Sequence, residues 1–259
     1  MMYARIDKQT TTVNGATMEY ALAGSNAPTI VLINGAGGPI DAWGFIWDSL
    51  KQEQRVIAYN RLGVDGSSKP ECSQSSSVVV AALRMLLSRL AIAPPFLLVG
   101  HSLGGLHANL FARQHPAEVC GIVLLDATAP DDIALMKSSK GALARTVERG
   151  IDALLGKDTF GETVHTETSA DQIYRAGPFP DIPVVVVTGS KLPMNWLMPR
   201  SAIAGRAANQ AALSKLSPSG QQIVGTKSGH FPQLTEPALV LAAIASVVRS
   251  CQVSSSYPQ

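Results

Sequence analysis

The most informative stretch of this sequence is residues 96–105, FLLVGHSLGG, in which an apolar run leads directly into a serine flanked by glycines. Such a run is typical of a strand buried inside a sheet, and a helical pattern begins at about Leu103. A sharp strand-to-helix turn lifts the serine hydroxyl clear of the sheet, and the neighbouring glycines relieve crowding there. The pattern predicts Ser102 as a nucleophile, the simpler alternative being a glycine-rich turn with a helix-capping serine.

Short apolar runs alternate with helical patterns along the rest of the chain, which is typical of a mainly parallel sheet flanked by helices. The first two runs are separated by Asn14-Gly15, which predicts an antiparallel hairpin. The predicted strands are residues 6–13, 17–23, 29–33, 55–59, 96–99, 121–125, 183–188 and 221–224, and the predicted helices are residues 75–90, 103–114, 206–216 and 237–249.

Residues 127–181 interrupt this alternation, because they are rich in Gly, Lys, Asp and Thr and show only patchy helical periodicity. A structureless loop of this length is uncommon inside a compact domain. We therefore expect a small, mostly helical cap insertion at 127–181. The core would comprise residues 1–126 and 182–252, followed by a flexible tail at 253–259.

Composition narrows the range of partners. The 259 residues are 46% hydrophobic and 15% charged, with a formal net charge of +2, so nucleic acid is not an expected partner. The three cysteines are widely spaced and predict neither a disulfide framework nor a metal site. The apolar stretches are too short for a bilayer, and the first residues lack a signal-peptide pattern. We expect a cytoplasmic monomer or homodimer with a small-molecule substrate and no membrane contact.

A serine nucleophile needs a base, and His230 in the segment SGHFP is the predicted one. It follows the last short strand, in a loop that can reach the carboxyl edge of the sheet. In chains with a serine on such a turn, the histidine comes last along the sequence. The other histidines have simpler expected roles in packing, in helices, in a helix cap or at a pocket wall: His101, His107, His115 and His165.

The acid that would orient His230 is identified partly from a stretch of the sequence that contains no acidic residue. A carboxylate could have come directly after the strand at 183–188, but no Asp or Glu occurs between residues 182 and 235. Asp126 ends the preceding buried strand, where an unpaired carboxylate would be costly and a histidine partner would stabilise it. Asp126 is the predicted acid, its alternative role being a cap where the chain leaves the strand. Asp131 and Asp132 are the reserve candidates.

The glycine-rich segment INGAGGP at residues 33–39 follows an early strand and predicts an oxyanion hole. Its donors would be the backbone N–H of Ala36 and that of Leu103, the residue after the nucleophile. Asn34 is expected either to brace this loop or to act as a simple turn residue. Large apolar side chains could form the walls of a pocket, although each is more often part of a core, and none is assigned a substrate contact: Trp43, Phe45, Trp47, Met136, Phe160, Met194, Trp196 and Met198.

Taken in order, the segments NGAGG, AYNRLGVDGS, GHSLGG, LLDAT and SGHF resemble the α/β-hydrolase superfamily over residues 29–250, and in particular its bacterial esterase-like members. The resemblance implies the α/β-hydrolase fold and hydrolytic activity, and it supports Asp126 as the acid. Two positions depart from the family pattern. Asn34 replaces a usual His, and Asn60 replaces a usual Asp before Arg61, a change expected to affect loop bracing.

The expected activity is cleavage of a small apolar ester through an acyl-enzyme on Ser102, without metal or cofactor. Two alternatives remain open. The same fold and a His–Asp pair can support cofactor-independent oxygenation or C–C bond hydrolysis, and in the oxygenase Ser102 would only bind substrate. The chain could also be a binding protein without turnover.

Overall fold

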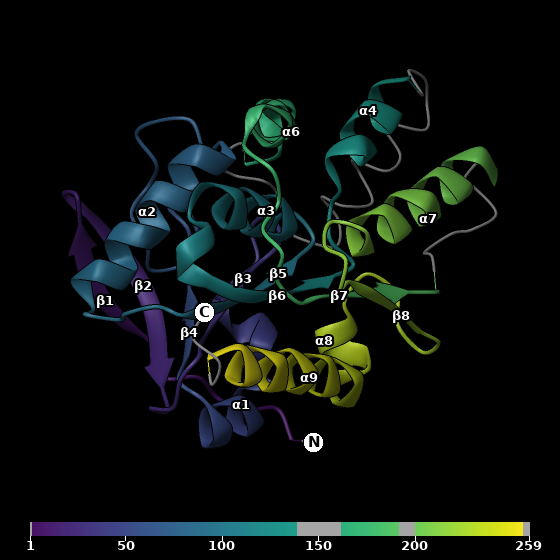
Figure 1. Ribbon diagram of the computed structural model, residues 1–259. Helices are drawn as coiled ribbons and strands as arrows, with labels where there is room; N and C mark the ends of the chain where they lie inside the picture. The colour runs from purple at the N-terminus through teal and green to yellow at the C-terminus, as the bar shows by residue number, and fades with distance from the viewer. Residues whose placement is uncertain (1, 139–161, 192–199, 256–259) are drawn as a thin grey trace.

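The computed structural model describes residues 2–138, 162–191 and 200–255. Its centre is one eight-stranded sheet in the order β1-β2-β4-β3-β5-β6-β7-β8 (Figure 1). From β4 to β8 all neighbouring strands pair in parallel, and the prediction of a mainly parallel sheet flanked by helices is confirmed. The strands are β1 (Gln9–Val13), β2 (Ala16–Ala23), β3 (Thr29–Ile33), β4 (Val56–Tyr59), β5 (Phe96–His101), β6 (Val119–Leu125), β7 (Val184–Gly189) and β8 (Gln221–Gly225).

The hairpin at the start of the chain forms as predicted. Asn14 and Gly15 have φ angles of 48° and 82°, the left-handed values that a two-residue hairpin turn requires. β1 therefore pairs antiparallel with β2, with Val13 opposite Ala16. The first strand is shorter than expected, because it begins at Gln9 rather than at residue 6.

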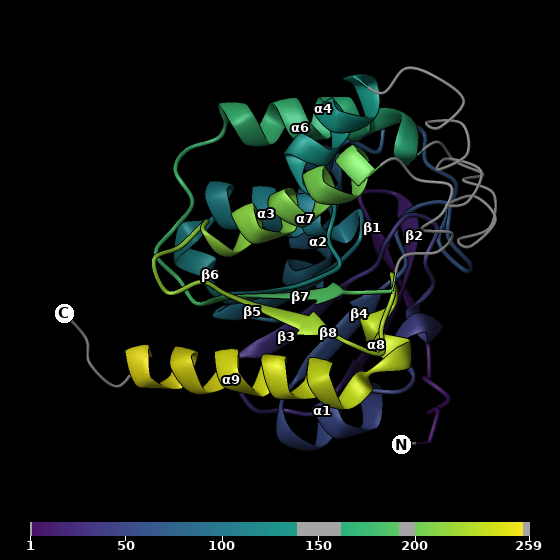
Figure 2. The same ribbon diagram turned by 90° about the vertical axis from the view of Figure 1, so that its right-hand side faces the viewer.

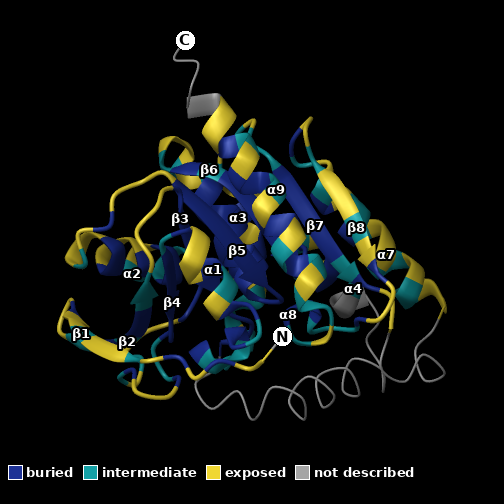
Figure 3. Cartoon of the chain, turned by 90° about the horizontal axis from the view of Figure 1, so that it is seen from below, coloured by how far each residue is buried: buried dark blue, intermediate teal, exposed yellow. Residues whose placement is uncertain are grey.

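Two apolar layers cover the two faces of the sheet. Successive residues of β5 alternate between them: Leu98 faces one layer, while Leu97 and Val99 face the other. Figure 2 shows α1 and α9 on one face and α2, α3, α6 and α7 on the opposite face. The central strands are almost wholly buried in Figure 3, which explains why they are apolar without interruption.

The main helices of these layers are α1 (Trp47–Glu53), α2 (Ser76–Arg89), α3 (Gly104–Gln114), α4 (Pro130–Ser138), α6 (Thr166–Arg175), α7 (Arg200–Ser214), α8 (Pro232–Thr235) and α9 (Pro237–Ser255). Short 3-10 turns lie at Ile40–Trp43, Pro116–Glu118 and Thr163–His165. The helices α1 and α8 were not expected, because seven and four residues are too few for a helical period to stand out. In the described residues no helix has both the length and the apolar character needed to cross a membrane.

The predicted insertion contributes α4 and α6, which contact each other, and α6 also packs against α2 and α3. Residues 139–161 lie outside the described residues, and the division into core and cap remains a prediction. At the other end of the chain, α9 continues to Ser255, past the expected end at Arg249. Within this last part of the helix, Cys251 is buried close to Gly121 of β6. The helix therefore extends into the segment that was expected to be a flexible tail.

Gly104→Ala should destabilise the protein, because α3 begins in direct contact with the end of β3. A Cβ at Gly104 would lie 2.2 Å from the backbone oxygen of Ile33 and 2.6 Å from that of Asn34. We expect a loss of about 1–3 kcal/mol in unfolding free energy, measured by urea titration. Gly177→Ala is the matched control, because a Cβ there meets nothing within 4 Å. Equal stability of the two variants would contradict the prediction.

Candidate active site

The turn that carries Ser102 is the sharp strand-to-helix turn expected of a nucleophile, and Ser102 itself is 7% exposed. β5 ends at His101 and α3 begins at Gly104, and Ser102 between them has a φ of 50°. A side chain at Gly100 would meet the backbone oxygen of Gly104 at 2.8 Å, so both glycines are needed for the chain to pass this closely over itself. A left-handed serine is strained, and such strain is concentrated at functional sites.

Asp126 and His230 meet at the carboxyl edge of the sheet. Asp126 directly follows β6, with a φ of 41°, and His230 lies in the loop between β8 and α8. His230 Nδ1 is 2.7 Å from Asp126 Oδ2. Since an ionised carboxylate only accepts, Nδ1 carries the proton and Nε2 is left with a free lone pair. Asp126 is 5% exposed, so water competes little for this hydrogen bond.

The reserve acids have other partners. Asp131 accepts a hydrogen bond from the Tyr174 hydroxyl. Asp132 accepts from the Ala129 N–H at 2.8 Å and from Asn209 Nδ2 at 2.8 Å, which holds the start of α4 in place. Asp126 is thus the carboxylate that the structure brings to His230.

His101 has a larger role at this edge than the expected sideways packing. Its Nε2 donates to the backbone oxygen of His230 at 2.7 Å, and the two rings are 5.0 Å apart. His101 is adjacent to Ser102, so this bond ties the loop of the candidate base to the turn of the candidate nucleophile. In the described structure no hydrogen bond joins Ser102 Oγ to the His230 ring; in ligand-free enzymes such contacts often tighten only with substrate.

Arg206 of α7 is a second partner of Asp126. Its Nη2 lies 2.7 Å from Asp126 Oδ2, the same oxygen that accepts from His230. Burial alone would raise the pKa of Asp126, but the hydrogen bond from His230 and the charge of Arg206 hold that pKa below its ordinary value. The sequence offered no signal for this contact, because a lone arginine in a weakly patterned helix matches no motif.

The loop after β3 lies directly against the serine turn. A Cβ on Gly35 would be 3.0 Å from Ser102 Cβ, a tight contact that glycine avoids. Within the described part of the chain, neither the Ala36 N–H nor the Leu103 N–H donates a hydrogen bond. Both predicted oxyanion donors are therefore unused. Asn34 braces the loop, since its Nδ2 donates to the backbone oxygen of Pro39 at 3.0 Å.

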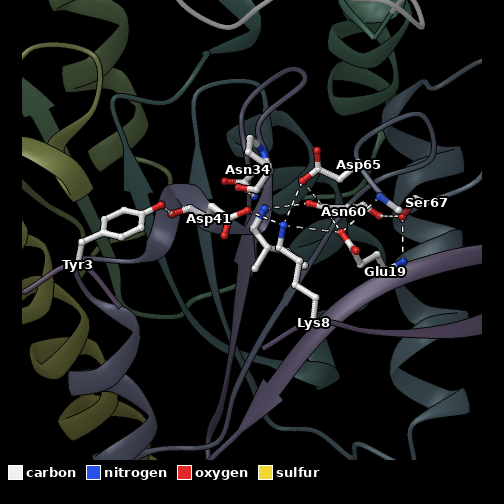
Figure 4. A network of polar contacts seen from close by, with 11 residues as sticks. Tyr3, Lys8, Glu19, Asn34, Asp41, Asn60, Asp65 and Ser67 are labelled. Atoms are coloured by element: carbon white, nitrogen blue, oxygen red, sulfur yellow. Dashed lines mark hydrogen bonds and ion pairs between the residues drawn. The ribbon is translucent and has the colours of Figure 1, made fainter. Parts of the chain in front are cut away.

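Asn60 also supports the loop after β3, as part of the polar network shown in Figure 4. Its Oδ1 accepts from the Ile40 N–H at 2.8 Å, and its Nδ2 donates to Glu19 at 2.5 Å. Lys8 adds an ion pair with Asp41 at 2.5 Å. The expected bracing role of Asn60 fits these contacts, because a neutral amide serves both an N–H donor and a carboxylate acceptor, which an Asp could not do.

Several residues expected at a pocket wall lie elsewhere. Trp43 and Trp47 are buried in the apolar layer beneath the sheet, with α1 and α9, and Phe45 packs edge-on against Tyr3 at 5.1 Å. For Trp43 and Trp47 the alternative role in the core is the one that the structure shows, because aromatic residues near a functional loop can equally fill the opposite face of the sheet. The remaining candidates fall outside the described side chains: Met136, Phe160, Met194, Trp196 and Met198.

The described residues offer no metal centre. In residues 2–138, 162–191 and 200–255, no group of three or more His, Cys, Asp and Glu side chains could hold an ion. The carboxylate nearest to His230 is already shared between an imidazole and a guanidinium.

His101 should make the protein sensitive to acid. Burial, followed by the charge of the neighbouring His230, lowers the pKa of His101 from 6.5 to about 3. Between these values the unfolded chain binds a proton that the folded chain excludes, so stability falls as the pH drops through this window. His101→Gln keeps a donor for the His230 carbonyl but has no titrating ring. The unfolding free energy of this variant should fall less steeply with decreasing pH, by about 1.4 kcal/mol per pH unit. Urea titrations from pH 7 to pH 4 test this, and parallel curves would contradict it.

Known proteins resemble this chain in sequence and in fold. An uncharacterised protein of Mycobacterium tuberculosis (strain ATCC 25618 / H37Rv) is 39% identical over 116 residues, which are 45% of this chain but only 33% of that protein's length. A proposed lipase from Acinetobacter baumannii AYE superimposes with a TM-score of 0.70 at 20% identity, covering 96% of this chain and 93% of that one. The enol-lactonase from Burkholderia xenovorans LB400 gives 0.66 at 20% identity, covering 93% and 100%.

At such identities the structural likeness shows the fold alone. The sequence match to a family is more specific, because residues 28–159 fit the family described as the alpha/beta hydrolase fold. That segment is just over half of the 259 residues and includes the loop after β3, the Ser102 turn and Asp126. The chain therefore belongs to the α/β-hydrolase fold family.

Proposed function

We propose that this protein is a serine hydrolase that cleaves small apolar esters through an acyl-enzyme. The observation that carries the proposal is the 2.7 Å hydrogen bond between His230 Nδ1 and Asp126 Oδ2, beside a serine with a φ of 50°. His101, the residue before Ser102, bonds the His230 backbone, so an oriented imidazole and the serine lie at the same edge of the sheet. A histidine oriented by a carboxylate is the group that activates a serine.

In the proposed mechanism, His230 Nε2 takes the proton of Ser102 Oγ as that oxygen attacks the ester carbonyl carbon. The Ala36 and Leu103 N–H groups stabilise the resulting oxyanion, an interaction of roughly 3–4 kcal/mol for each donor. The tetrahedral intermediate collapses when His230 returns the proton to the leaving alcohol. Water then attacks the acyl-enzyme with His230 again as base, and Asp126 stabilises the imidazolium in both steps.

The substrate class is inferred from this chemistry and from similarity. The superimposed enol-lactonase and proposed lipase are named for ester substrates, which supports an ester here. The mechanism uses neither metal nor cofactor, and a net charge of +2 gives no reason to expect nucleic acid as a partner. We expect a monomer or homodimer that acts on a small molecule.

A fluorophosphonate probe tests the proposal directly, because it forms a covalent bond with activated serines. We expect one adduct, mapped to Ser102 by mass spectrometry and absent in Ser102→Ala. His230→Ala and Asp126→Asn should slow labelling by roughly 10²–10⁴-fold, because the base is lost or misoriented. Asp131→Asn is the control, since this carboxylate bonds Tyr174 rather than His230.

Two outcomes would count against the proposal. A folded wild-type protein that does not react with the probe excludes the acyl-enzyme mechanism. Turnover that survives Ser102→Ala but is lost in His230→Ala would favour the cofactor-independent alternative, in which Ser102 only binds substrate.

Arg206 should influence the pH dependence of ester cleavage. Its guanidinium opposes protonation of Asp126 and helps to hold the pKa of that carboxyl below its ordinary value. Arg206→Gln should therefore raise the pKa of Asp126 and move the acid limb of the kcat/KM profile to higher pH. Arg206→Lys, which keeps the charge, should shift the limb less. Superimposable profiles for wild type and Arg206→Gln would contradict this prediction.

A further inference from the structure

A buried ion pair links the predicted insertion to the loop after β3. Arg61 and Glu162 are each only 3% exposed, and they form a two-pronged contact. Arg61 Nε lies 2.5 Å from Glu162 Oε1, and Nη2 lies 2.9 Å from Glu162 Oε2. Glu162 directly precedes the 3-10 turn Thr163–His165, so this partner comes from the insertion and not from the sheet.

Both members of the pair also bond the backbone on either side of Ala36. Arg61 Nη1 donates to the Asn34 oxygen at 2.7 Å, and Nη2 donates to the Gly35 oxygen at 2.5 Å. On the other side, Glu162 Oε2 accepts from the Gly37 N–H at 2.6 Å. The peptide groups before and after Ala36 are thus held by one ion pair.

The loop after β3 depends on such hydrogen bonds for a fixed conformation. Ala36 lies between two glycines, and Gly37 has a φ of 60°, so the backbone itself imposes little order here. An oxyanion donor is effective only if it is already aimed at the position of the developing charge. Glu162 occupies the Gly37 N–H, whereas no hydrogen bond from the Ala36 N–H is found among the described residues, so the Ala36 N–H is available to a substrate.

We propose that Glu162 is a positioning residue, which acts with Arg61 to fix the orientation of the Ala36 N–H and so makes the oxyanion hole depend on the insertion. The inference rests on the proposed function. A buried ion pair is a weak source of stability and is often replaceable by apolar residues, so its expected signature lies in the rate rather than in folding.

Glu162→Gln tests the role with almost no change in volume. We expect kcat for p-nitrophenyl butyrate to fall by roughly 10–100-fold while KM changes by less than about threefold, because the loss is confined to the transition state. Labelling of Ser102 by the fluorophosphonate should slow by a similar factor, since the phosphonyl oxygen enters the same hole. Asp171→Asn, which removes an exposed carboxylate from α6, should match the wild type.

A second variant distinguishes a loss of loop positioning from a failure to fold. Arg61→Met combined with Glu162→Met replaces the pair by apolar side chains of similar size and leaves no buried charge unpaired. If the pair positions the loop, this double variant should melt as a folded protein and still show the fall in kcat.

The outcomes separate this inference from the proposed function. Wild-type protein that is not labelled at Ser102 overturns both. Wild-type protein that is labelled, together with a folded Glu162→Gln or double variant that reacts at the wild-type rate, overturns the positioning role alone. If Glu162→Gln does not fold, the double variant decides.

Discussion

The site depends on how closely the chain passes over itself at the end of β5. Gly104 lies so close to the backbone oxygen of Ile33 that there is no room for a side chain, and Gly35 lies in close contact with Ser102. These contacts bring the loop after β3, the serine turn and the start of α3 into one compact unit. Because parallel strands present their carboxyl ends at one edge, Asp126 and the loop of His230 reach the same place.

Charge at this edge is handled by pairing rather than by exposure to water. Asp126 is shared by His230 and Arg206, and Glu162 is shared by Arg61 and a backbone N–H. A buried carboxylate with one partner would be costly, whereas two donors satisfy its oxygens and fix its orientation. The arrangement also leaves unused the two backbone N–H groups from which an oxyanion would benefit.

The parts of this structure that follow from local pattern were predictable from the sequence. Uninterrupted apolar runs identified the buried strands, Asn14-Gly15 identified the hairpin, and glycine spacing together with strand order pointed to Ser102, Asp126 and His230. The contacts of Arg206 and Glu162 were not predictable, because they join positions far apart in sequence through single side chains. The sequence left Trp43 open between a pocket wall and the core, since an aromatic residue does not reveal which face of a sheet it fills.

The position of Glu162 has a consequence for the modularity of this protein. An insertion in a fold of this type can be regarded as a separate module, which could be exchanged to change the substrates that reach the active site. Here the predicted insertion contributes a buried side chain, Glu162, which bonds Arg61 and the Gly37 N–H. If Glu162 has the positioning role proposed above, a chimera with a foreign insertion that lacks an acidic residue at this point would change in reaction rate as well as in substrate selectivity.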